Sequence, residues 1–141
     1  VFVAEGYQAS ERSRFLADVA IFSDYMLSVS SNVSRLNASL SAFDKYFNVT
    51  ALFVASAQSG TDQPNKGIFV DTYFSSTQHG ADGRLNYGDQ NKLATLLSQP
   101  FASDAREIGV VLINSPVYGG VGWLVGVGER VRYCFGRGHV A

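Results

Sequence analysis

The stretch EIGVVLIN, residues 107–114, is the part of the sequence that most directly indicates the fold. Its apolar residues follow one another without polar alternation, so it is predicted to be a strand buried on both faces. Val1–Ala4 is a second apolar run of this kind, closed by Glu5 and Gly6. Residues 48–56, NVTALFVAS, are β-branched and apolar on both faces and are predicted to form a central strand.

Patterns typical of helices lie between these strands. The clearest one has apolar residues one helical turn apart, at Phe15, Val19, Phe22, Met26 and Val29. Ser10 is its expected N-cap, and Glu11 falls in the first turn, where a negative charge interacts favourably with the helix dipole. Two shorter patterns follow, one at Leu36, Leu40, Phe43 and Phe47, the other at Leu93, Leu96 and Leu97 with Asp89 as cap and Pro100 as end.

The last part of the chain is predicted to form a hairpin. Its two apolar stretches are VGWLVGV, residues 121–127, and RVRYCF, residues 130–135, with Gly128 at the turn. Strands that alternate with helices predict an α/β fold with a mixed β-sheet and packed helices.

Residues 57–90 interrupt this alternation with a long polar segment rich in glycine. Loops of this length are uncommon in compact domains, so we expect the segment to be functional or held down by another part of the chain. Asp62, Asp71 and Asp82 lie in it and offer carboxylates for calcium, but their spacing does not match the EF-hand pattern. Turn formation and capping are the better-supported roles for these aspartates.

Composition restricts the class of protein. The 141 residues correspond to one domain, residues 1–141, with a net charge of -1 and no clustered basic face, which argues against nucleic acid as a partner. No apolar run approaches the roughly 20 residues that a membrane span requires. Cys134 is the only cysteine, so an internal disulfide is excluded. The chain opens on the apolar run at Val1, without Met or a signal peptide, as a fragment or a processed form does.

Four stretches, taken in order, resemble the immunoglobulin A peptidase family of zinc metallopeptidases. They are VFVAEGYQASERSRFLADV at residues 1–19, FNVTALFVASAQSGTDQP at residues 47–64, Asp71-Thr72, and IGVVLINSPVYGGVG at residues 108–122. The resemblance covers about residues 1–122. It implies the α/β fold of a zincin-like metallopeptidase catalytic domain.

The resemblance also implies chemistry that these residues do not contain. In the family, a helix with His-Glu-x-x-His follows the Tyr-Gly-Gly segment, and it binds zinc and activates a water molecule. This sequence has only His79 and His139, neither in such a motif, and residues 123–141 depart from the family pattern. We therefore expect an incomplete domain without catalytic or metal-binding residues of its own, from a parent enzyme that uses zinc.

The candidate substrate-binding residues are those of the glycine-rich stretch after residue 117, namely Tyr118, Gly119, Gly120, Val121 and Gly122. In zinc peptidases of this type, an edge strand beside the metal takes the substrate backbone as an added strand. The alternative is that these glycines only shape a turn. Asp62 and Asp71 match family positions and are candidates for bracing the long loop.

Two functions remain open from the sequence. The first is a partial zinc-dependent metallopeptidase domain, inactive as this chain, whose complete parent hydrolyses a protein or peptide substrate. The alternative is a non-catalytic, secreted binding domain on the same scaffold. Three glycosylation sequons, at Asn32, Asn37 and Asn48, give weak support to export, and we expect a secreted or extracellular protein.

Overall fold

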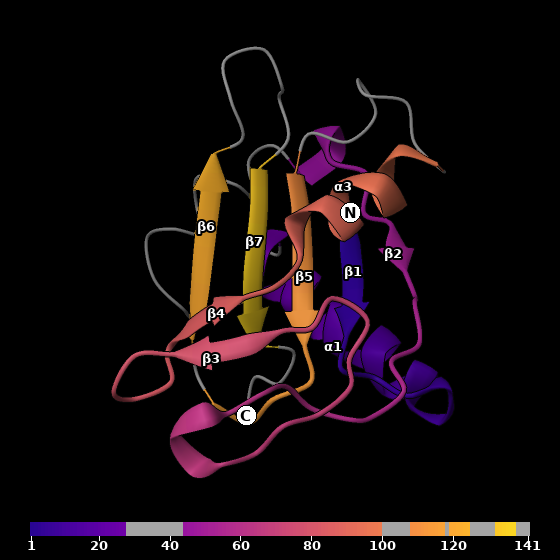
Figure 1. Cartoon of the computed structure of the whole chain (residues 1–141). Coiled ribbons are helices and arrows are strands. Elements are labelled where there is room, and N and C mark those ends of the chain that lie inside the picture. The colour runs from indigo at the N-terminus through magenta and orange to yellow at the C-terminus, as the bar shows by residue number, and fades with distance from the viewer. Residues whose placement is uncertain (28–43, 100–107, 118, 125–131, 138–141) are drawn as a thin grey trace.

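A five-stranded mixed sheet forms the centre of the protein (Figure 1). The computed structural model describes residues 1–27, 44–99, 108–117, 119–124 and 132–137. The strand order is β2-β1-β5-β7-β6, with β6 antiparallel to β7 and the other neighbours parallel. The bounds are β1 Phe2–Glu5, β2 Ala51–Leu52, β5 Ile108–Ile113, β6 Gly120–Leu124 and β7 Arg132–Arg137. The prediction of an α/β fold with a mixed sheet and packed helices is confirmed.

Strands β1 and β5 are buried on both faces, as their continuous apolar sequences predict. They pair in parallel from Phe2 opposite Val110 to Glu5 opposite Ile113. Because side chains alternate along a strand, each strand contributes to two apolar clusters. One cluster contains Val3, Phe74, Leu93, Leu97, Val111 and Ile113, and the other contains Phe2, Ala4, Tyr7, Phe15, Val19, Val110 and Leu112.

Helix α1, Arg12–Leu27, covers the second of these clusters and follows the short 3-10 helix η1, Ala9–Glu11. The predicted cap at Ser10 is wrong, because the helical turn already begins at Ala9. The Gln8 backbone N–H donates to Glu11 Oε2 at 2.9 Å, so a glutamate in the first turn satisfies the free donor instead. Glu11 lies in the first turn as predicted.

Helix α3, Gln90–Ser98, covers the opposite face of the sheet with Leu93 and Leu97. Asp89 is its N-cap, as predicted, and its carboxylate accepts the backbone N–H groups of Asn91 and Lys92. The pattern predicted as a helix from Leu36 to Phe47 falls largely outside the described residues, and Asp44–Tyr46 forms a 3-10 turn, η2.

The prediction that residues 48–56 form a central strand is wrong. Only Ala51–Leu52 joins the sheet, at the end of the strand order beside β1. Beyond it, Phe53 and Val54 are half-buried and pack against opposite clusters. The stretch is apolar on both faces because its side chains pack against the clusters on both sides of the sheet. Strand β5, and not this stretch, lies at the centre of the sheet.

The predicted hairpin near the end of the chain is confirmed as an antiparallel pair. Gly120 lies opposite Gly136 and Leu124 opposite Arg132. Strand β7 lies between β5 and β6, and Cys134 is in register with Val110 of β5 and with Gly122 of β6. The stretch from residue 132 to 137 thus occupies an inner position of the sheet.

Residues 57–90, called the excursion below, leave the sheet and return to it at α3. They are not a structureless loop, because they contain the 3-10 helix η3, Pro64–Lys66, and an antiparallel hairpin of β3, Thr77–His79, and β4, Leu85–Tyr87. In Figure 1 the hairpin crosses in front of the main sheet near the start of β6. No helix in the described part of the chain is long and apolar enough to cross a membrane.

Candidate functional site

The excursion is anchored to the sheet by a buried carboxylate, that of Glu5 at the end of β1. Glu5 is 0% exposed, and its Oε1 accepts the Thr72 hydroxyl at 2.6 Å and the Ser76 N–H at 3.0 Å. Its Oε2 accepts the Phe74 N–H at 2.9 Å. A buried carboxylate needs such donors to offset its desolvation. The interaction therefore fixes the segment that leads into β3.

The two aspartates predicted to brace the excursion lie in different surroundings. Asp62 Oδ1 accepts the Val70 N–H at 2.7 Å, and its backbone bonds to Ser76 and Gln78. Asp71 is exposed and joins Gln58 through its own backbone N–H and C=O groups. Only Asp62 thus links parts of the excursion through its side chain in these contacts.

The candidate glycines lie where the excursion meets the sheet edge. Arg84, in the turn before β4, places its carbonyl oxygen 2.2 Å from where a Cβ on Gly119 would stand, so no larger residue fits there without a shift. The same oxygen accepts the Gly120 N–H at 3.0 Å. Tyr118 lies outside the described residues. Gly119 therefore allows the Arg84 backbone to approach closely.

Strand β6 is the last strand of the sheet, and its backbone has a defined orientation. Gly120 gives its N–H to Arg84, not to β7. In an antiparallel pair, backbone groups point alternately toward and away from the partner strand. The backbone N–H and C=O groups of Gly122 and Leu124 therefore point away from β7, while those of Val121 and Trp123 point toward it. An extended segment beside β6 would meet donors and acceptors with the spacing of a strand.

A polar network joins the ends of β1 and β5 to the excursion. Asn114, directly after β5, donates its side-chain N–H groups to Gly6 O, Glu11 Oε1 and Ser59 Oγ at 3.0, 3.2 and 2.9 Å. Gly6 has a positive φ of 70°, and a Cβ there would stand 1.9 Å from the Gly60 oxygen. The network is thus built around a glycine that no other residue can replace without a shift.

Glu11 is the titratable member of this network. Burial raises the pKa of its carboxyl, but hydrogen bonds from Gln8, Ser59 and Asn114 and the nearby Arg14 lower it more, so the pKa lies below the ordinary 4.5. The ionised form of Glu11 is therefore favoured in the folded protein.

Sequence reasoning missed Glu5, Glu11 and Asn114 as organising residues. The available signal was their position, since each polar residue comes at or just after the end of an apolar strand or at a helix start. At those places, backbone groups need partners that the sheet no longer supplies.

The potential metal ligands are dispersed. His79 is exposed at the end of β3 with its ring 5.2 Å from that of Tyr87, and Asp82 pairs with Arg84 at 3.5 Å. His139 lies outside the described residues. Across the described ranges, no three His, Cys, Asp or Glu side chains come together as a metal site would require. The described residues therefore do not form a zinc-binding site.

Comparison with known proteins gives the family. A search of curated protein sequences returned no match. Residues 1–127 match the family described as IgA Peptidase M64, which includes the strand β1, the Glu5-anchored excursion and the β6 edge. The chain therefore belongs to the IgA peptidase M64 family.

Proposed function

We propose that the outer edge of β6 binds an extended segment of a protein or peptide substrate. The observation that carries this proposal is the Gly120 N–H, which donates to Arg84 O at 3.0 Å, because alternation along the strand then directs the backbone groups of Gly122 and Leu124 away from β7. Strand addition uses such groups for affinity and pockets near the edge for specificity. Arg84 already accepts the Gly120 N–H, so the bound segment would begin beyond that contact. Gly119, Gly120, Val121 and Gly122 would together determine where that segment begins.

In this proposal the chain supplies the sheet and the substrate edge of a zincin-like, zinc-dependent peptidase domain. Family membership supports a protein substrate, and the antiparallel edge strand that begins at Gly120 supports the zincin-like assignment. These 141 residues contain no His-Glu-x-x-His, so zinc and its activated water would depend on residues outside them. The chain by itself would bind peptide without hydrolysing it, and the parent would act outside the cell.

A second candidate is a secreted binding domain that kept the scaffold without the zinc motif. The β6 edge serves this candidate equally, because strand addition requires no metal. Sequencing of the transcript through and beyond the codons for residues 120–141 separates them. A His-Glu-x-x-His in frame after β7 supports a peptidase, and its absence supports the binding domain.

Peptide binding to β6 is tested by removing single backbone hydrogen bonds. Gly122→Pro deletes an N–H that faces the outer edge, a position where an edge strand tolerates proline. We expect the affinity for a short fluorescein-labelled peptide of Ser, Thr and Val to fall about tenfold, as the loss of one hydrogen bond predicts. Gly122→Ala, which keeps the N–H, is the matched control.

The same test is made from the side of the peptide. N-methylation at alternate residues of the peptide should weaken binding, while methylation at the intervening residues should not, because a paired strand uses every second backbone group. Equal affinity of Gly122→Pro and Gly122→Ala, with no alternation along the peptide, would reject the edge as the binding site.

A further inference from the structure

A small pocket lies next to the start of β6. Its volume is about 200 Å³, and it is lined by Gln63, Asn65, Lys66, Gln78, Ala81, Asp82, Gly83 and Val117. This is smaller than the roughly 300–1,000 Å³ of pockets for drug-sized ligands, so it suits one amino-acid side chain. Gly83 precedes Arg84, and Val117 comes three residues before Gly120, so the pocket adjoins the point where Arg84 meets the edge.

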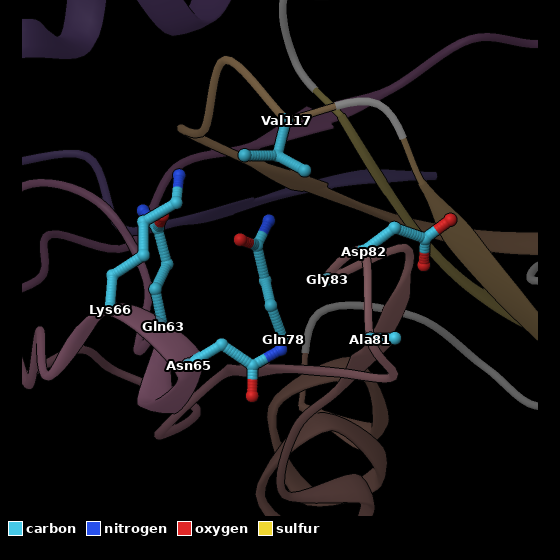
Figure 2. Close-up of a pocket in the computed structure, with 8 residues that line it drawn as sticks. All are labelled: Gln63, Asn65, Lys66, Gln78, Ala81, Asp82, Gly83 and Val117. Atoms are coloured by element: carbon cyan, nitrogen blue, oxygen red, sulfur yellow. The ribbon is translucent and has the colours of Figure 1, made fainter.

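The inner wall of the pocket is held in place by Gln78. Its side chain is 3% exposed, and its Nε2 donates to Ser115 Oγ at 3.0 Å. Figure 2 shows Gln78 extending toward Val117, with Lys66 and Gln63 on one side and Gly83 on the other. The pocket is thus bounded by a fixed carboxamide and not by surface side chains alone.

The charges around the pocket are not balanced. The Asp82 carboxylate pairs with Arg84 at 3.5 Å and points away from Gln78 in Figure 2. Lys66, on the opposite side, has no carboxylate at ion-pair distance among the residues that the structure describes. The Asn65 amide N–H group is already bonded to Gly80 O at 2.6 Å. The remaining uncompensated charge facing the pocket is therefore the positive charge of Lys66.

We propose that this pocket is a specificity subsite that takes an acidic side chain of the peptide bound along β6. The Lys66 ammonium would pair with the carboxylate, and the carboxamides of Gln63 and Gln78 would offer further hydrogen bonds. This inference rests on the proposed function, because the peptide backbone must lie on β6 to bring a side chain to the pocket.

The test uses the full 141-residue chain and a set of fluorescein-labelled peptides of Ser, Thr and Val. One Glu is moved through each position in turn, and Gln, Ala and Lys are then placed at the best position. We expect one position to prefer Glu over Ala by about three- to tenfold, within the range for a partly exposed charged hydrogen bond. The preference should shrink as salt rises, since screening weakens an exposed pair.

Charge reversal identifies the residue responsible. Lys66→Glu should abolish the preference for Glu and create one for Lys, whereas Arg12→Glu, the same charge change on the exposed start of α1, should leave it intact. Equal binding of the Glu and Ala peptides, or a Glu preference that survives Lys66→Glu, would overturn the subsite while leaving peptide binding in place.

Failure of the proposed function gives a different result. If no peptide in the set binds, both the edge and the subsite are rejected. If the Glu peptide binds in a Lys66-dependent manner but Gly122→Pro does not weaken it, Lys66 binds an acidic group, but the subsite for a peptide along β6 is overturned together with the edge.

Discussion

The paired strands β1 and β5 and the excursion of residues 57–90 lie against each other, yet different interactions hold them. The strands bury apolar side chains on both faces, including Val3, Val111 and Leu112, which are 0% exposed. The excursion has few buried apolar residues of its own and is fixed by hydrogen bonds to Glu5, at the end of β1. The sheet provides the stable support, and a few polar contacts position the segment that borders the candidate site.

This contrast has a consequence for function. The groups assigned to peptide binding, the β6 edge and the pocket around Gln78, depend on where the β3–β4 hairpin lies. That hairpin follows directly from the segment held by Glu5. A change in the polar anchor should therefore alter binding with a smaller loss of global stability than a change in the sheet.

The largest effect is expected in the sheet itself, from Leu112→Ala. Leu112, on β5, is fully buried in the cluster that α1 covers, and a buried Leu→Ala change costs about 2–5 kcal/mol. Urea denaturation should show a lower midpoint with an unchanged slope. Leu85→Ala, in the exposed hairpin strand β4, is the control and should change stability by about 0.5 kcal/mol or less. Similar losses for the two variants would contradict the division between sheet and excursion.

A smaller and more local effect is expected from Glu5→Gln. The amide keeps the shape of the side chain but has one acceptor oxygen, so its NH₂ group faces at least one of the donors of Thr72, Phe74 and Ser76. The expected loss is about 1–3 kcal/mol, the cost of a buried donor left unsatisfied. Hydrogen exchange should accelerate at the amides of Phe74 and Ser76 more than at that of Val111.

Asp71→Asn is the matched control for this variant, because it makes the same chemical change on an exposed residue of the excursion. It should leave exchange and peptide binding unchanged. Uniform acceleration across sheet and excursion in Glu5→Gln would show that Glu5 supports the whole fold and does not selectively position the hairpin.

The difference between the two regions also explains what the sequence could predict. The runs Val1–Ala4 and 107–114 predict buried strands, because a strand buried on both faces has apolar residues at consecutive positions. The pattern does not distinguish central from edge strands, and it predicts a central strand at residues 48–56, although only Ala51–Leu52 pairs, at the edge. Which strand lies inside depends on contacts between residues far apart in the chain.

The candidate site is harder to predict from the sequence, because it too depends on contacts between residues far apart in the chain. The glycines at 119 and 120 stand out in the sequence, but their partner Arg84 lies 35 and 36 residues earlier and carries no local signal. The hairpin β3–β4 has only three residues in each strand, too few to form a recognisable alternation. The sequence predicts only that Glu5 ends a strand, whereas its buried carboxylate accepts hydrogen bonds from residues 67 to 71 positions away in the chain.

The smallest effect is expected from pH, at the network where the two regions meet. Glu11 contacts Asn114 at the end of β5 and Ser59 in the excursion, and its pKa in the folded protein lies below the ordinary 4.5. A lowered pKa means that the ionised form stabilises the fold above about pH 4.5, and that this contribution is lost as the pH falls through the folded value. Glu11→Gln should therefore reduce stability at neutral pH and show a shallower decline than wild type below pH 4.5, measured by urea denaturation across that range.

Asp24→Asn, on the exposed side of α1, should retain the wild-type acid decline. If Glu11→Gln declines as steeply as wild type, the acid sensitivity belongs to other carboxylates, and the junction between sheet and excursion is held mainly by Asn114 and its bond to Gly6.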